Sequence, residues 1–212
     1  MGTLGRLLTA VGDGFFADFR LRRRMRKAPR AELGSLAENT FARITGTVRP
    51  NGKRLLEAPL SGRLCAYYSV TVIAASEHLG QRTTIGSEED ALTFVVDDGS
   101  GRAVIDPAHA VISAAFDFLS ESMAAFDADP QQRATLERMG LVRRNWFTTD
   151  LVQYREAIIE IDEVIAVYGA GVRELDPDAA PTGMYRDSGP QRMRFTGTAK
   201  HPLLISDDPR TL

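Results

Sequence analysis

The first segment of the chain carries apolar residues at helical spacing. They recur at steps of three and four, which places them on one face of a helix, and a basic run follows before Pro29 ends the pattern. We therefore predict an amphipathic helix within residues 1–30. Its apolar face consists of Leu4, Leu7, Leu8, Val11, Phe15 and Phe19, and the basic run includes Arg22, Arg23 and Arg24.

From Thr40 onward the pattern is typical of β-strands. Stretches rich in β-branched and aromatic residues are separated by turn residues such as Pro50-Asn51-Gly52. The predicted strands lie within residues 41–50, 63–76, 91–107, 163–175 and 191–206.

A helical insertion is predicted at about residues 107–145. Asp106-Pro107 and Asp129-Pro130 each combine an N-cap residue with proline at the first helical position, and Gly140 is placed to end the second helix. The first of these helices would use Val111, Ile112, Ala115, Phe116, Leu119, Met123 and Phe126 as its apolar face.

The order of these elements predicts a mainly β fold with an α insertion (α+β). Three strands, a helical stretch and two more strands are typical of an OB-like β-barrel. Gly46 and Gly169 stand inside predicted strands, where glycine permits the sharp coiling of a small barrel. We expect an N-terminal helix over residues 1–30 and a barrel domain over residues 31–212.

The composition of the chain bears on its domain size and on the cellular compartment that we expect for it. The 212 residues suffice for one domain with a sizeable core, and no apolar run is long enough to span a membrane. The single cysteine, Cys65, excludes an internal disulfide. We find no secretory signal and expect a cytoplasmic protein.

Charge is distributed unevenly along the chain. Residues 1–30 carry eight Lys/Arg and two Asp/Glu, whereas the remaining 182 carry 18 Lys/Arg and 26 Asp/Glu. An apolar face followed by a basic run suits a helix that lies on an anionic membrane surface. The alternative is a helix packed on its own domain or on a sister subunit of a homo-oligomer.

Four stretches of the sequence resemble one family. "LLEAPLSGRLCAYYSVTV", residues 55–72, is similar to the APLSG-x-x-C-x-YY signature of the GIDE domain, also called the BAM (beside-a-membrane) domain. That domain occurs in a mitochondrial ubiquitin ligase that activates NF-κB signalling. "FVVDDGSGRAVIDP", "EVIAVYGAGVRE" and "FTGTAKHPLLISDD" resemble its other strands.

The resemblance implies a non-enzymatic binding or scaffolding module beside a membrane, with a protein partner. A RING finger needs a series of Cys and His ligands that this chain lacks, and transmembrane helices are also missing. Ubiquitin-ligase activity is therefore not expected, and the basic N-terminal segment would replace the missing membrane spans.

The loop "DDGSG", residues 97–101, fits no catalytic motif. Gly99 separates Asp98 from Ser100, unlike an aspartic-protease site, and no lysine follows as in a phosphate-binding loop. The loop joins two predicted strands, so we interpret it as a hairpin turn.

One pair of residues is a weak candidate for a catalytic site. Cys65 and His201 could form a nucleophile–base pair, which makes a cysteine-dependent enzyme the second alternative function. Cys65 lies in an apolar strand, however, where free cysteine usually behaves as a buried hydrophobe. Three dispersed histidines predict no metal site, and no cofactor is expected.

A binding surface is the stronger expectation. A tyrosine on the strand of residues 63–76 could stack on a nucleobase, and a local basic cluster makes an OB-type single-stranded nucleic-acid binder the first alternative function. The cluster is Arg43, Arg49, Lys53, Arg54 and Arg63. The candidate binding residues are Ser61, Arg63, Tyr67, Tyr68, Lys200 and His201.

Overall fold

The structure is a computed structural model that describes residues 14–76, 81–123, 127–141, 151–179 and 189–212. These residues form two compact units. The eight-stranded unit comprises Asp18–Arg54, Leu92–Ala114 and Ile161–Leu212. The five-stranded unit consists mainly of Leu55–Ala91 and Ala115–Glu160.

The eight-stranded unit is built on one sheet with the order β11-β12-β6-β5-β1-β10-β13-β7. Neighbours are antiparallel except for the β12–β6 and β13–β7 pairs, which are parallel. The strands are β1 (Ala42–Pro50), β5 (Phe94–Asp97), β6 (Arg102–Asp106), β7 (Ala110–Ser113), β10 (Val164–Gly169), β11 (Gly171–Leu175), β12 (Gln191–Thr196) and β13 (Leu203–Ser206).

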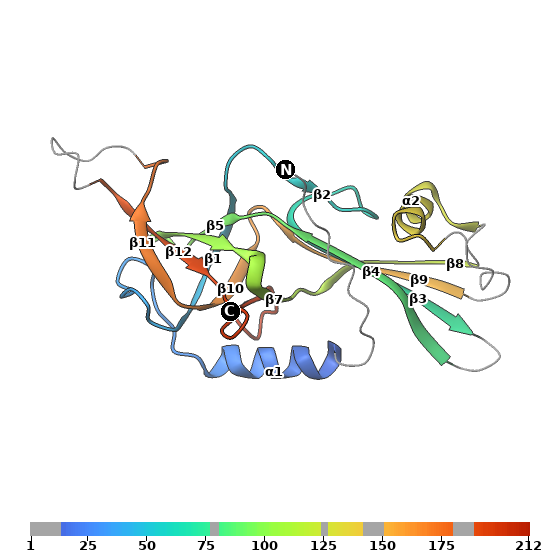
Figure 1. The fold of residues 1–212 in the computed structure, drawn as a ribbon, viewed down its shortest axis with the longest axis horizontal. Coiled ribbons are helices and arrows are strands. Elements are labelled where there is room, and N and C mark those ends of the chain that lie inside the picture. Colours follow the sequence, from blue (N-terminus) through green and yellow to red (C-terminus); the bar gives the residue numbers. More distant parts are fainter. Residues whose placement is uncertain (1–13, 77–80, 124–126, 142–150, 180–188) are drawn as a thin grey trace. The chain divides into compact units, whose positions relative to one another are not determined.

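The two ends of a six-strand path in this sheet, β10 and β11, are joined by the chain itself. Only Ala170 separates β10 from β11, yet β10 pairs with β1 while β11 pairs with β12. The strand pairings lead from β1 through β5, β6 and β12 to β11. Ala170 then connects β11 to β10, and β10 pairs with β1. Figure 1 shows the strong curl of the sheet that this connection requires.

Gly46 explains how β1 can lie so close to β5. A Cβ atom at this position would stand 2.6 Å from the carbonyl oxygen of Asp97 on β5, a separation that no side chain tolerates. Glycine is therefore required at this contact between the two strands. The inner positions of the curled sheet, such as Ile44, Val96 and Phe195, are fully buried and form its core.

Helix α1 (Gly14–Lys27) packs on the eight-stranded unit through its second half. Leu21 and Met25, one helical turn apart, are buried against Ala166 of β10 and Leu204 of β13. The helix of the first 30 residues is confirmed over the part that the structure describes. Its predicted apolar positions Leu4, Leu7, Leu8 and Val11 lie outside the described residues, as do the side chains of Phe15 and Phe19.

The five-stranded unit is a second sheet with the order β2-β3-β9-β8, and β4 also pairs with β3. Helix α2 (Pro130–Arg138) covers one face through a core that includes Leu136, Val70 and Tyr154. The strands are β2 (Leu56–Glu57), β3 (Leu64–Ser76), β4 (Gln81–Ala91), β8 (Phe116–Met123) and β9 (Leu151–Glu160).

Most predicted elements are confirmed, and the fold is mainly β. The stretches 41–50 and 63–76 form β1 and β3, and 91–107 forms two strands joined by a turn, as predicted. Residues 163–175 were expected to form one strand but form β10 and β11. Helix α2 begins at the predicted place, with an Asp129–Gln132 capping box. Residues 191–206 were expected to form one strand but form β12 and β13.

The predicted helix from Pro107 to Phe126 is wrong. Asp106 caps only the three-residue 3-10 helix η1 (Pro107–His109), and β7 and β8 follow. In β8, alternate residues face α2: Phe118 packs on the core and Ser120 accepts a hydrogen bond from Gln132. The strand period of two therefore determines which residues are buried, and Val111, Phe116 and Leu119 of the predicted apolar face are exposed.

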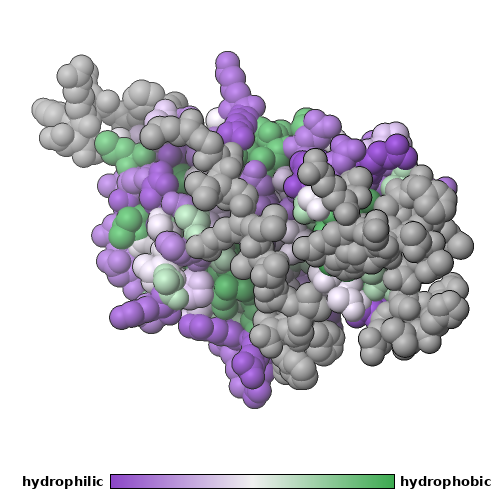
Figure 2. Space-filling model, turned by 45° about the vertical axis from the view of Figure 1, so that its right-hand side comes forward, coloured by the Kyte–Doolittle hydropathy of each residue, from purple (hydrophilic) through white to green (hydrophobic). Residues whose placement is uncertain are grey.

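On the face shown in Figure 2, hydrophobic side chains form separate small patches among hydrophilic ones. No helix in the described part of the chain combines the length and the apolar character that crossing a lipid bilayer requires.

Candidate functional site

Helix α1 presents a cationic face to solvent. Arg20, Arg23, Arg26 and Lys27 are exposed, on the side of the helix away from the buried pair. No ion pair joins these four side chains to any carboxylate of the described residues. Arg22, predicted as part of the same basic run, instead forms a 2.8 Å ion pair with Asp208.

The signature stretch around Ser61 is held by a buried carboxylate. Glu156 of β9 is fully buried and accepts hydrogen bonds from the backbone N–H groups of Leu60 at 2.7 Å and Ser61 at 3.0 Å. The loop closes with a hydrogen bond from Gly62 N–H to the carbonyl of Ala58. The APLSG stretch is therefore explained as a loop shaped to surround this carboxylate.

Cys65 is placed as a core residue. Its side chain is fully buried, and burial together with the nearby charges of Glu156 and Glu160 raises its thiol pKa to about 12. The nucleophilic form of cysteine is the thiolate. Cys65 is therefore protonated at neutral pH and unsuited to nucleophilic attack.

Neither candidate tyrosine forms an exposed stacking surface. Tyr67 is buried, and its hydroxyl donates a hydrogen bond to Glu89 at 3.4 Å. Tyr68 is half-buried on the opposite face, where it packs against the core under α2. Burial and the charge of Glu88 raise the pKa of Tyr68 to about 12. Both rings serve the packing of the five-stranded unit.

The basic cluster expected to contact nucleic acid is largely engaged in structural contacts. Arg43 is buried and donates to the carbonyl of Thr211 at 2.7 Å. Arg49 forms an ion pair with Asp162. Arg63 forms one with Glu160 in the five-stranded unit. Of the five residues, only Lys53 and Arg54 are exposed without such a contact among the described residues.

The acidic loop between β5 and β6 is a turn, as predicted. Gly99 has a φ of +83°, and the Asp98 carboxylate accepts hydrogen bonds from Ser100 and from the N–H groups of Gly101 and Leu33. Burial alone would raise the pKa of Asp98, but these hydrogen bonds outweigh it and lower the pKa. Asp98 thus ties the hairpin to the segment that precedes β1.

Lys200 and His201 lie in a turn beside a pocket whose lining combines apolar and polar residues. Thr198 and His201 close this turn through backbone hydrogen bonds in both directions. The pocket has a volume of about 300 Å³ and is lined by ten residues at the corner where β10 becomes β11. They include Asn39, Phe41, Ala170, Arg194, Thr196 and His201. Lys200 is exposed and is not a lining residue.

A row of ring contacts links this pocket to α1. The His201 ring lies 5.9 Å from the ring of Phe41, and Phe41 lies 6.0 Å from the ring of Tyr168. Arg24 of α1 lies over the Tyr168 ring, with its guanidinium carbon 5.3 Å from the ring centroid. This is a cation–π contact within the eight-stranded unit. The pocket and α1 are therefore joined by one continuous strip of side chains.

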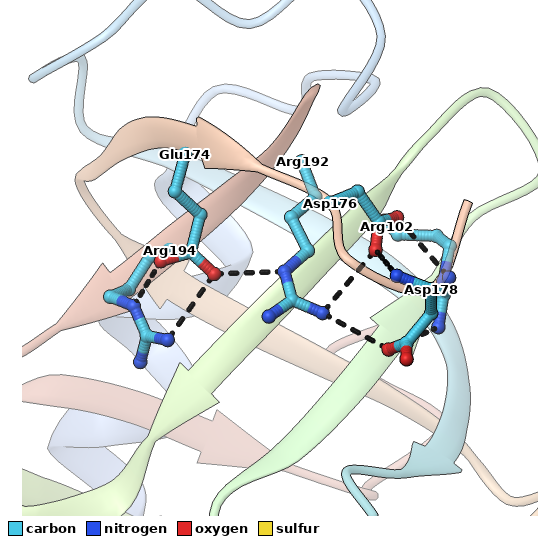
Figure 3. A network of polar contacts seen from close by, with 6 residues as sticks. All are labelled: Arg102, Glu174, Asp176, Asp178, Arg192 and Arg194. Carbon is cyan, nitrogen blue, oxygen red and sulfur yellow. Dashed lines mark hydrogen bonds and ion pairs between the residues drawn. The ribbon is translucent and has the colours of Figure 1, made fainter. Parts of the chain in front are cut away.

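Arg194, which lines the pocket, ends a network of ion pairs that crosses β6, β12 and the β11 edge (Figure 3). Glu174 accepts hydrogen bonds from Arg194 and Arg192, and Arg192 also reaches Asp176 at 3.4 Å. The hydrogen bond from Arg194, followed by that from Arg192, lowers the pKa of Glu174 despite partial burial. The network consists of Arg102, Arg192, Arg194, Glu174, Asp176 and Asp178.

No group of three or more His, Cys, Asp or Glu side chains in the described ranges is arranged to hold a metal ion.

No protein-family model, curated protein or solved structure matches this chain. The resemblance to the GIDE domain therefore rests on the residues of the four sequence stretches alone.

Sequence reasoning identified His201 as a site residue but missed the rest of the pocket. Phe41, Ala170 and Arg194 are far apart along the chain and come together only because β10 and β11 bend around Ala170. The glycines on either side of Ala170, in "YGAGV", are the signal that could have indicated this bend.

Proposed function

We propose that this chain is a non-enzymatic binding module that meets an anionic membrane surface through helix α1. The observation that carries the proposal is the set of four exposed cations on one side of the helix, none of them paired with a carboxylate of the described residues. An uncompensated row of cations on a rigid helix is suited to an extended anionic surface.

The mode of attachment differs from the insertion of an apolar face. Leu21 and Met25 of α1 are buried in the eight-stranded unit, so this part of the helix offers charge rather than apolar area to a partner. Each basic residue near an anionic bilayer contributes about 1 kcal/mol, so the four together contribute up to about 4 kcal/mol. Binding of this kind is reversible and weakens with salt.

We propose further that the closed path of strands is an OB-like barrel. Two observations support this assignment: β6 and β12 pair in parallel, and the bent β10–β11 strand pairs with β1 on one side and β12 on the other. In this assignment the five-stranded unit consists of two insertions, one between β1 and β5 and one between β7 and β10. OB-like barrels act mainly as binding modules.

The resemblance to the GIDE domain favours the same function. The signature residues Ser61 and Cys65 have structural explanations in the buried carboxylate and the core, which agrees with a scaffold rather than an enzyme. A protein partner recruited to the membrane remains part of the proposal. A cytoplasmic, peripheral location follows from it.

The proposal is tested by vesicle flotation of the full chain at low and high salt. Arg20, Arg23, Arg26 and Lys27 are changed together to Gln, which keeps the helix propensity nearly unchanged. We expect the unaltered chain to float with phosphatidylserine-containing vesicles at low salt only. The four changes should weaken partition by up to about a thousandfold.

The matched control changes four other exposed cations to Gln, namely Lys53, Arg54, Arg82 and Arg133. It removes the same charge and should float normally. Equal flotation of both variants, or none by the unaltered chain, would contradict the proposal. Binding of a single-stranded oligonucleotide that only the Lys53/Arg54 control loses would instead establish the nucleic-acid alternative.

A further inference from the structure

We propose that the pocket at the β10–β11 corner binds a phosphate monoester. This site is separate from the cationic face of α1 and does not depend on the membrane function proposed for that face. Its volume of about 300 Å³ is at the lower end of small-molecule sites and suits a phosphate with a short organic group.

The charge of the pocket selects an anion. None of the ten lining residues, all within the described part of the chain, carries a carboxylate, while Arg194 contributes a guanidinium that is also paired with Glu174 outside the lining. A cationic ligand would find no counter-charge in this lining. An anion would be attracted by Arg194 and by Lys200, which is exposed in the adjoining turn.

Three polar groups of the lining are not engaged by other described residues. The Thr196 hydroxyl, the His201 ring nitrogens and the Asn39 amide have no hydrogen-bond partner among the described residues. These donors come from three separate segments around the cavity. Single donors converging from several directions suit the three terminal oxygens of a phosphate better than a planar carboxylate.

Arg194 is held in position before any ligand arrives. Glu174 accepts from its Nε and Nη2 atoms, and Glu174 is itself held by Arg192, so the guanidinium cannot swing freely (Figure 3). Fixing an arginine in this way reduces the side-chain entropy lost when a ligand binds. Arg194 keeps N–H groups that are not directed at Glu174.

The remaining lining accommodates the organic part of the ligand. Phe41 and Val172 are large apolar residues with 43% and 45% of their surface exposed. Phe41 also belongs to the row of ring contacts that leads to α1. A phosphate monoester could therefore be a soluble metabolite or the headgroup of a phospholipid in a bilayer that α1 contacts.

The test is a titration of the full chain with glycerol 3-phosphate, followed by amide chemical shifts, with glycerol as the uncharged control. We expect saturable shifts in residues of the pocket with glycerol 3-phosphate and none with glycerol. His201→Phe keeps the ring contact with Phe41 but removes the donors, and should weaken binding about tenfold or more. Ala170→Leu should fill the cavity and abolish binding.

Thr83→Val, on β4 of the five-stranded unit, is the matched control and should bind normally. The variant with the four α1 cations changed to Gln should also bind normally, which separates this site from the proposed membrane face. The proposal is overturned if glycerol 3-phosphate gives no saturable shifts. It is equally overturned if binding survives Ala170→Leu, or if it is lost with the α1 cations.

A second titration identifies the source of the phosphate. Short-chain phosphatidic acid below its micelle concentration presents the same phosphate monoester with acyl chains attached. Tighter binding than glycerol 3-phosphate would support a lipid headgroup as the ligand. Equal or weaker binding would support a soluble phosphate ester.

Discussion

Glu156 and Asp98 are carboxylates whose main partners are backbone N–H groups. The Glu156 carboxylate accepts hydrogen bonds from the N–H groups of Leu60 and Ser61. The Asp98 carboxylate links the β5–β6 hairpin to Leu33 in the same way. Backbone donors cannot move away when a carboxylate is replaced, so each substitution leaves donors unpaired. Both carboxylates thus connect separate segments of the fold.

The Glu156→Gln variant should be destabilised by about 2–3 kcal/mol. Glutamine has the same shape, but its NH₂ group must face one of the two backbone N–H groups that now donate hydrogen bonds to the carboxylate. Urea denaturation would measure the loss. Glu137→Gln, on the exposed side of α2, is the control and should change stability little. Equal stability of both variants would mean that the loop does not depend on the charge.

Asp98 should make stability depend on pH. Its folded-state pKa lies below its ordinary value, so ionised Asp98 stabilises the fold above the unfolded pKa. The advantage of the unaltered chain over Asp98→Asn should be constant above about pH 5 and should shrink as pH falls through the carboxyl range. Denaturation at several pH values measures it, with Asp127→Asn as the exposed control. A pH-independent difference would contradict this assignment.

Among the secondary-structure elements, α1 combines two roles on opposite sides. Its inner side is fixed by Leu21 and Met25, while its outer side carries the unpaired cations. Three basic residues in its last turn also interact favourably with the helix dipole. The inner side therefore determines whether the cations are presented in a fixed array.

Met25→Ala should destabilise the chain by about 2–4 kcal/mol, because Met25 is fully buried against Ala166 and Leu204. Arg26→Ala, at the adjacent exposed position, should change stability by less than about 0.5 kcal/mol. Thermal denaturation of both variants would measure this contrast. Similar effects would show that α1 is not docked on the eight-stranded unit.

The elements that sequence patterns predicted are those with a clear apolar face or a cap. β3 is rich in β-branched and aromatic residues, and α2 carries its complete capping box. β4 has no fully buried face, since its described residues from Thr84 to Ala91 are all half-buried, so no pattern marked it. β9 alternates less clearly because Ala157, Ile158 and Ile159 are buried in succession.

The candidate site was less predictable than the fold for a physical reason. A single lining residue, His201, could be singled out because it lies next to Pro202 after a strand. Arg194 looked like any exposed strand residue, since its partner Glu174 comes from another strand. Both the partner and the pocket depend on pairing between distant strands, which residue patterns within one segment do not contain.

At the scale of the whole molecule, the five-stranded unit is formed mainly by two excursions of the chain, defined as the segments Leu55–Ala91 and Ala115–Glu160 that interrupt the eight-stranded unit in sequence. β1 and β5 pair directly at Pro50 and Phe94, so the first excursion begins and ends at one hairpin position. Ser113 and Ala166 are each paired with Ser206, about 10 Å apart across β13. Short connections could therefore replace both excursions.

A chain with residues 51–93 and 115–160 replaced by short Gly-containing linkers should fold cooperatively. The strand pairings of the eight-stranded unit do not involve the removed residues. Keeping Phe94 as the first retained residue preserves its pairing with Pro50. Circular dichroism during urea denaturation is the measurement. A gradual, non-cooperative transition would show that the unit needs its excursions.

The contacts that fix α1 also have a consequence for the order of synthesis. The helix lies near the start of the chain, whereas Ala166 and Leu204, which bury Leu21 and Met25, come near its end. On the ribosome α1 therefore emerges long before its docking surface exists. Throughout that interval the apolar and the cationic side of α1 are both accessible to a bilayer. The apolar side becomes buried only after β10 and β13 have been synthesised.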